Sequence, residues 1–228
     1  MPRIKLIDRI MPTYTRGEEK FNMVSHIVGG GVGILTLIAC VIVAAYFGNG
    51  WGVVSGAIYG FTMILLYTMS SIYHGLKHDM GKRVFRVIDH CSIFLLIAGT
   101  YTPLTLVSLR LQDPVLAWII FGVVWGAAIL GVTLNSIDLK KYRVFSMICY
   151  LGMGWCMFIA INPMLKALPM NKGFGLIIAG GISYTIGAIL YGVGKKIKYM
   201  HSVFHIFVVI ASILHSVCIA VYVMPIVK

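Results

Sequence analysis

Residues 21–76 read FNMVSHIVGGGVGILTLIACVIVAAYFGNGWGVVSGAIYGFTMILLYTMSSIYHGL, and these 56 positions contain no Lys, Arg, Asp or Glu. A membrane-spanning helix needs about 20 mostly apolar residues, so the run is too long for one span. Its length suits two spans, and Gly48-Asn49-Gly50 provides a turn between them. The run therefore predicts a helical hairpin that crosses a membrane twice.

Five further apolar runs follow when the rest of the chain is divided at its charged residues. They span residues 90–109, 114–137, 144–165, 173–194 and 199–227. Each is long enough for one transmembrane helix, so the chain is predicted to be an all-α integral membrane protein with a seven-helix bundle. We expect one transmembrane domain over residues 21–228 and a cytoplasmic segment over residues 1–20. Ile4, Ile7 and Ile10 recur at helical spacing there, which allows either an interfacial amphipathic helix or a basic tail.

The composition of the chain excludes most other classes of protein. Of its 228 residues, 59% are hydrophobic and 11% are charged, whereas a soluble domain is about half apolar and about a quarter charged. An ordinary soluble globule, a disordered tail and a secreted disulfide scaffold are therefore excluded. The 19 Lys and Arg outnumber the 7 Asp and Glu. Because no basic block is interleaved with aromatic residues, this excess indicates loops beside a membrane and not a nucleic-acid partner.

The distribution of the basic residues predicts the orientation of the bundle. With seven spans, 15 of the 19 Lys and Arg fall in the N-terminal segment and in the loops on its side of the membrane. The other side holds the remaining four, which are Arg110, Lys166, Lys172 and Lys228. Since cytoplasmic loops carry an excess of Lys and Arg, we expect the N-terminus in the cytoplasm and the C-terminus outside.

Glycines at four-residue spacing are expected to bring helices close together inside the bundle. Gly52, Gly56 and Gly60 form such a stripe in the second span, and Gly122 and Gly126 repeat the spacing in the fourth. Small residues of this kind let helix backbones approach each other closely in lipid, and the alternative to packing inside the bundle is a dimer interface.

The histidines gather at one level of the predicted bundle. Six of the seven fall near its cytoplasmic end, namely His26, His74, His78, His90, His201 and His205. Only His215 is predicted to lie deeper, as an interior histidine. Ionisable side chains at membrane depth are costly and usually mark a functional site. The convergence of histidines from distant segments therefore points to a site at this end.

The spacing of these residues suggests a metal site. His201 and His205 are four residues apart and share one helix face, as two metal ligands on a helix must. Three histidines with one open position form a known zinc arrangement, in which zinc lowers the pKa of a bound water to about 7 and polarises carbonyl groups. Asp89, which we expect to open the third span, could take a proton or orient a ligand histidine. The residues alone leave a second interpretation open, which is interfacial histidines bonded to main-chain carbonyls.

Several neighbouring residues remain candidates for the same site. Cys91 is a reserve metal ligand, and the alternative ligands are His78, Asp79 and His90. A further group lies at the entry to the first span and comprises Glu18, Glu19, Asn22 and His26. This group could cover or support the metal site, or its acidic members could cap a helix N-terminus.

Three motifs in order along the chain resemble those of the hemolysin III family. They are an S-x-x-x-H segment at residues 70–74, Asp89 at the head of the run DHCSIF, and an H-x-x-x-H segment at residues 201–205. The segment RGEEKFNMVSH, residues 16–26, is similar to the entry to the first span in the bacterial branch. This family is grouped with the adiponectin and progestin receptors and, more distantly, with the alkaline ceramidases. The resemblance covers nearly the whole chain.

The resemblance implies a zinc ion held by His74, His201 and His205, with Asp89 and Ser70 close by. It suggests a metal-dependent lipid amide hydrolase that acts in membrane lipid homeostasis, with Asp89 as general base and Ser70 orienting water or stabilising an oxyanion. The alternatives are a non-catalytic membrane regulator with structural zinc and a hemolysin-like cytolysin. The expected partners are membrane lipids such as ceramide-like or acyl-amide substrates, in a bacterial cytoplasmic membrane. A soluble protein ligand is not expected because the outer loops are short, and the oligomeric state stays open.

Overall fold

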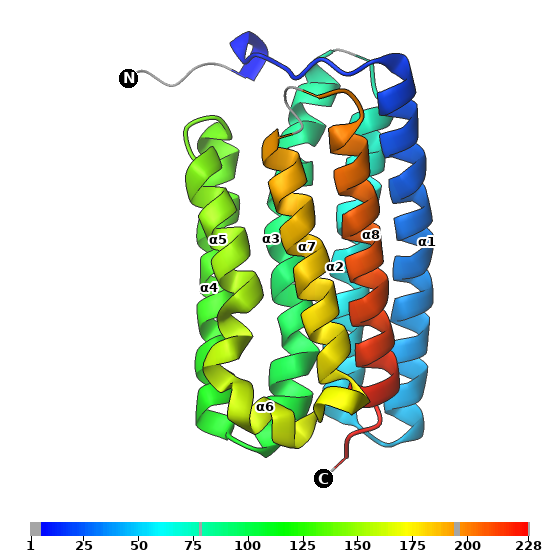
Figure 1. Ribbon diagram of the computed structural model, residues 1–228, viewed down its shortest axis with the longest axis vertical. Coiled ribbons are helices and arrows are strands. Elements are labelled where there is room, and N and C mark those ends of the chain that lie inside the picture. The colour runs from blue at the N-terminus through cyan, green and yellow to red at the C-terminus, as the bar shows by residue number, and fades with distance from the viewer. Residues whose placement is uncertain (1–5, 78, 194–196, 228) are drawn as a thin grey trace.

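The computed structural model describes residues 6–77, 79–193 and 197–227, and every regular element in these residues is helical (Figure 1). The α-helices are α1 (Arg16–Tyr46), α2 (Gly50–Gly75), α3 (Met80–Pro103), α4 (Pro114–Asp138), α5 (Arg143–Trp155), α6 (Ile161–Ala167), α7 (Phe174–Val193) and α8 (Met200–Cys218). Short 3-10 turns are η1 (Leu6–Asp8), η3 (Leu109–Leu111), η4 (Cys156–Ala160) and η5 (Met170–Lys172). The π-helical turns η2 (Leu104–Ser108) and η6 (Ile219–Val223) continue α3 and α8.

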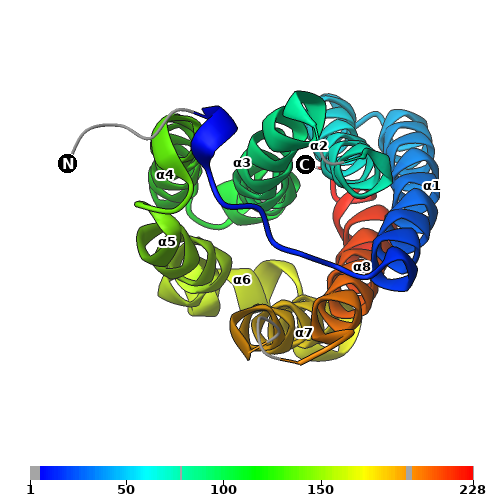
Figure 2. The ribbon, with the colours of Figure 1, turned by 90° about the horizontal axis from the view of Figure 1, so that it is seen from above.

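These elements form seven segments that are long and apolar enough to cross a membrane, as predicted. Helix α5 leads through η4 into α6, so these three elements make one span. The spans form a ring in which each helix packs against the next, and α8 closes the ring against α1 (Figure 2). Because the number of spans is odd, the two ends of the chain lie at opposite ends of the bundle (Figure 1).

Polar side chains at the helix N-termini explain where several spans begin. Thr15 and Glu18 form a capping box at the start of α1, in which each side chain bonds to the other residue's backbone. Asn49 accepts a hydrogen bond from the backbone N–H of Gly52, which places the start of α2 directly after the predicted turn. Asp79 and Asp113 cap α3 and α4 in the same way. These caps satisfy N–H groups that a helix leaves without a partner.

The division at charged residues placed two helix starts too late. Helix α1 begins at Arg16 and α3 begins at Met80, whereas the sequence indicated residues 21 and 90. The first turns of α3 carry charged side chains at the end of the bundle, so an uncharged window misses them. Asp89 consequently lies about two and a half turns inside α3 and does not open the span.

The N-terminal segment crosses the end of the bundle that is predicted to be cytoplasmic, from α1 toward α4 (Figure 2). Its regular structure within the described residues is the single turn η1, and Ile4 lies outside them. Arg83 donates hydrogen bonds to the carbonyls of Leu6 and Arg9, and Arg86 donates to the carbonyl of Ile10 at 3.2 Å. The segment is therefore held over the bundle by α3.

Two of the predicted glycine contacts join α1 and α2 closely. A Cβ atom added at Gly60 would lie 2.6 Å from the Cα atom of Leu37, and one added at Gly56 would lie 2.8 Å from the Cβ atom of Cys40. The prediction that Gly122 and Gly126 pack inside the bundle is wrong, because an added Cβ at either would have no atom of another described helix within 4 Å. The glycines of α2 and those of α4 share the four-residue spacing, but only those of α2 face a neighbouring helix.

Substitution of Gly60 by Ala should therefore destabilise the bundle. The new Cβ atom has to displace backbone and not a flexible side chain, so we expect a loss of about 1–3 kcal/mol in the free energy of unfolding. Thermal unfolding of the purified protein in detergent measures this change. Gly122→Ala is the matched control and should unfold at the wild-type temperature or slightly above it. Equal unfolding temperatures for the two variants would contradict the close packing of α1 on α2.

Candidate metal centre

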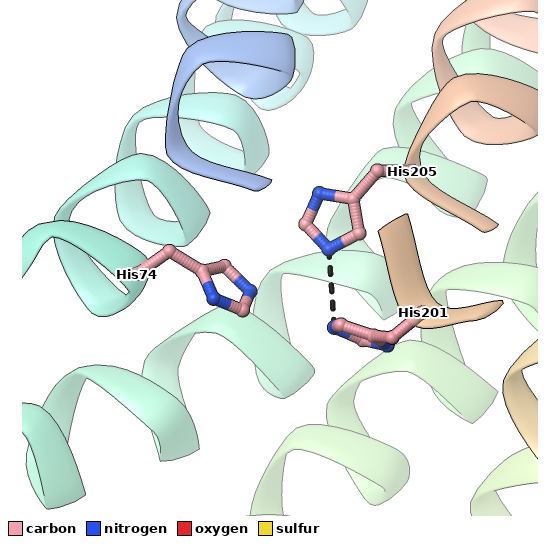
Figure 3. Close-up of side chains that lie close together, drawn as sticks. All are labelled: His74, His201 and His205. Carbon is pink, nitrogen blue, oxygen red and sulfur yellow. Dashed lines mark hydrogen bonds between the residues drawn. The ribbon is translucent and has the colours of Figure 1, made fainter. Parts of the chain in front are cut away.

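Three histidines from two distant segments meet near the predicted cytoplasmic end of the bundle (Figure 3). His74 lies at the last turn of α2, and His201 and His205 lie on the first turns of α8. One ring nitrogen of each lies within 4.8 Å of the others. The Nε2 atoms of His201 and His205 are 3.1 Å apart. The structure thus brings together the three predicted ligands.

The geometry suits a tetrahedral metal ion. Zinc binds imidazole nitrogens at about 2.0–2.1 Å, so two ligands in a tetrahedral site lie about 3.3 Å apart. The separation of 3.1 Å between the two Nε2 atoms on α8 is close to this value. The Nε2 atom of His74 is buried and has no hydrogen-bond partner in the described chain, which leaves its lone pair available. The donor set of three imidazoles therefore fits zinc, with a fourth position open.

The carboxylate of Glu19 holds the ring of His74 through Nδ1, the ring nitrogen that does not face α8. The Nδ1 atom of His74 lies 2.7 Å from Oε2 of Glu19 on α1, which sets Nε2 as the atom that faces α8. The other oxygen of Glu19 lies 2.9 Å from the Nζ atom of Lys82, a side chain that is 1% exposed. A carboxylate on the far nitrogen of a ligand histidine is the usual support for a metal site.

Lys82 also closes the C-terminal end of α2. Its Nζ atom donates hydrogen bonds to the carbonyls of Tyr73 at 2.9 Å and Leu76 at 3.0 Å. A cation at a helix C-terminus satisfies carbonyls that have no partner within the helix. The sequence pattern placed Lys82 among the loop charges, and no motif distinguished it. Its role follows only from the structure.

The start of α8 is held by the neighbouring glutamate. Tyr199 adopts a left-handed backbone conformation with φ of 61°, and its N–H donates to Oε1 of Glu18 at 2.8 Å. The ring of Tyr14, in the N-terminal segment, stacks on His201 with centroids 4.9 Å apart. Burial raises the pKa of Tyr14 above its usual range, so the hydroxyl stays protonated. Glu18 thus fulfils the predicted capping role and also positions the pair of histidines on α8.

His26 and Asn22 lie beside the metal site and outside its ligand group. The ring of His26 stacks on His205 with centroids 3.8 Å apart, and its edge meets Tyr67. Both ring nitrogens of His26 and both side-chain polar atoms of Asn22 are buried without a hydrogen-bond partner in the described chain. These two residues therefore form a polar wall next to the ligand on α8.

Asp89 and Ser70 line the same cavity as two of the three histidines, His201 and His205. This cavity has a volume of about 170 Å³, and its lining includes His26, Ser70, Asp89, His201 and His205. The rest of its lining is mainly apolar and comes from α3, α5, α7 and α8. Ser70 is buried, and Oδ2 of Asp89 lies 3.6 Å from Nδ1 of His90. We call this space the apolar cavity.

The other candidate ligands have different partners. Cys91 lies against α4, with its sulfur 3.6 Å from the carbonyl of Val132. His90 lies 2.9 Å from the carbonyl of Arg86, and Asp79 caps α3. His78 lies outside the described residues. His215 is buried deeper, as predicted, with Nε2 at 3.1 Å from the carbonyl of Ile177.

The fold and the site define a multi-pass membrane protein with a three-histidine group that could hold a metal ion. Residues 14–216 match the family described as Haemolysin-III related, and the chain belongs to this family.

Named relatives share most of their length with this chain. It is 36% identical over 208 residues to "Hemolysin-3" of Bacillus cereus, which covers 91% of this chain and 93% of the relative. It is 36% identical over 209 residues to "Hemolysin-3 homolog" of Bacillus subtilis (strain 168), which covers 92% and 96%. "Monocyte to macrophage differentiation factor" of Homo sapiens is 27% identical over 177 residues, which covers 72% and 68%.

Substitution of Glu19 by Gln should weaken zinc binding by about 10- to 100-fold. The amide cannot hold Nδ1 of His74 as the carboxylate does, and it leaves Lys82 without its ionic partner. Competition with a chromophoric zinc chelator measures the affinity of the purified protein, and His205→Ala gives the reference for a lost ligand.

The matched control for this variant is Asp113→Asn, which removes the same charge at the opposite end of the bundle. Asn caps a helix about as well as Asp, so its zinc affinity should equal that of the wild type. A Glu19→Gln protein with wild-type affinity would show that the carboxylate does not support the ligand.

Proposed function

We propose that this protein is a zinc-dependent hydrolase that cleaves lipid amides within the membrane and takes part in membrane lipid homeostasis. The observation that carries the proposal is the three-histidine group, two of whose members, His201 and His205, line a cavity that also holds Asp89 and Ser70. A polar reaction centre therefore adjoins a mainly apolar space inside a transmembrane bundle. An acyl chain is the substrate part that such a space would bind.

The ligand residues in this proposal are His74, His201 and His205. When bound, zinc supplies Lewis-acid chemistry, which polarises a carbonyl and makes water a nucleophile near neutral pH. Glu19 keeps the ring of His74 in place through Nδ1. The ring of this ligand is therefore held in its metal-binding orientation before a substrate binds.

Asp89 is the proposed general base. Its carboxylate is available to accept the proton of an attacking water and to return it to the departing amine. Ser70, on the α2 face that lines the cavity, would orient the water or donate its hydroxyl to the developing oxyanion. The apolar walls limit the access of bulk water, which strengthens each of these interactions.

A second candidate is a non-catalytic regulator in which zinc is structural. The contacts of Glu19 favour it, because they already join α1 to α2 and α3, and a metal ion would add α8 to the same connection. The names of the Bacillus relatives also suggest cytolysis. The mainly apolar lining of the cavity gives less support to a water-filled pore than to lipid binding. Because the chain has seven candidate membrane spans and these relatives are bacterial, we propose a bacterial cytoplasmic membrane as its location, with membrane lipids as partners.

Asp89→Asn should reduce amide hydrolysis by about 10²- to 10⁴-fold, the usual contribution of a general base. Purified protein with bound zinc is incubated with ceramide-like and acyl-amide lipids in mixed micelles, and released fatty acid is measured. The zinc content of the variant is determined in parallel and should match that of the wild type. Equal release by wild type and variant would remove Asp89 from the mechanism, and no release by a zinc-loaded wild type would favour the regulator.

A further inference from the structure

A second cavity, of about 650 Å³, adjoins the metal site on the predicted cytoplasmic side. The N-terminal segment that crosses this end of the bundle forms one wall (Figure 2). The other walls come from the start of α3, the connection between α4 and α5, and the region where α7 leads into α8. The residues that it shares with the apolar cavity are His90, Leu139, Arg143, Tyr191 and His201. The two cavities therefore meet at His201, one of the proposed zinc ligands.

The lining of this second cavity, which we call the basic vestibule, carries an excess of positive charge. Its cationic residues are Arg9, Arg83, Arg86, Lys140, Arg143 and Lys198, and its carboxylates are Asp8, Glu18 and Asp138. Two of these carboxylates, Glu18 and Asp138, already accept hydrogen bonds from main-chain N–H groups. Glu18 accepts from Thr15 and Tyr199 at 2.8 Å, and Asp138 accepts from the N–H of Lys140 at 2.9 Å.

Five of these cations, Arg83, Arg86, Lys140, Arg143 and Lys198, form no ion pair with a carboxylate of the described chain. Arg83 and Arg86 donate to main-chain carbonyls of the N-terminal segment, which carry no net charge. The ion pairs within 4.0 Å among the described residues involve His74, Lys82 and His90, and none of them involves these five cations. The Nε atom of Arg86 is buried and has no hydrogen-bond partner in the described chain. The excess of cationic over anionic side chains around one cavity suits an anionic ligand.

We propose that the basic vestibule binds the anionic headgroup of an amphiphilic acyl-amide substrate, a phosphate or carboxylate group. Guanidinium groups recognise both anions through paired, charge-assisted hydrogen bonds. The acyl chain would enter the apolar cavity, and the amide that joins the two parts would lie at their junction beside His201. This inference rests on the proposed function and specifies its substrate class. The positive-inside rule accounts for cations at this end, but not for their arrangement around one cavity.

The test compares two ligands that share an acyl chain: N-dodecanoylethanolamine, which is neutral, and its O-phosphate ester. Isothermal titration calorimetry of the full chain in neutral detergent measures both affinities directly. The phosphate ester should bind at least about tenfold more tightly, which corresponds to one charge-assisted hydrogen bond. The double variant Lys140→Gln/Lys198→Gln, at two positions that line only the vestibule, should lose this preference and keep the affinity for the neutral amide, which also shows that it is folded.

The matched control is Lys77→Gln/Lys141→Gln, which changes the charge equally at positions outside the lining of the vestibule. It should keep the preference for the ester. Equal binding of the two amides, or equal loss in the two double variants, would overturn the proposal in favour of general surface charge. Inorganic phosphate that binds as tightly as the ester would instead indicate a site for free anions.

Failure of this inference can be separated from failure of the proposed hydrolase. The calorimetric preference does not require turnover, so a clear preference without release of fatty acid would contradict only the hydrolase. If the two amides bound with equal affinity and were cleaved with equal efficiency, only the proposed headgroup site in the basic vestibule would be contradicted.

Discussion

The carboxylate of Glu19 is the contact on which the arrangement of the site depends. It lies 2.7 Å from Nδ1 of His74 and 2.9 Å from Nζ of Lys82, and it joins α1 to α2 and α3. Charged groups at this depth cost several kcal/mol when they have no partner, so each needs the other. Lys82 also donates hydrogen bonds to the carbonyls at the end of α2. The same cation therefore binds both the helix end and the carboxylate that holds the histidine ring. The lone pair of His74 is thereby directed toward α8.

Two adjacent glutamates in the first turn of α1 position the metal ligands on α2 and on α8. Glu19 reaches α2 and α3, whereas Glu18 accepts the N–H of Tyr199 at the start of α8. A single helical turn thus positions ligands that are 127 residues apart in the sequence, His74 and His201. Glu18 also lines the basic vestibule, which meets the apolar cavity at His201.

The seven spans could be predicted because long uncharged runs have no other stable environment than lipid. The convergence of His74, His201 and His205 could also be predicted, since the topology returns their segments to one end of the bundle. The role of Lys82 could not be predicted, because a lysine outside an apolar run has the sequence pattern of a loop charge. Only the fold shows that it is buried. The left-handed conformation of Tyr199 depends on a partner 181 positions away, so no local pattern encodes it. The roles of Asp89 and Ser70 in catalysis remain predictions that the cavity makes chemically reasonable.

The most direct measurement is anomalous X-ray scattering from crystals of the purified protein on both sides of the zinc absorption edge. We expect one strong peak between α2 and α8, about 2.0–2.1 Å from a ring nitrogen of each of His74, His201 and His205. A peak elsewhere, or none at this position in crystals grown with zinc, would contradict the central claim that the three imidazoles share one metal ion.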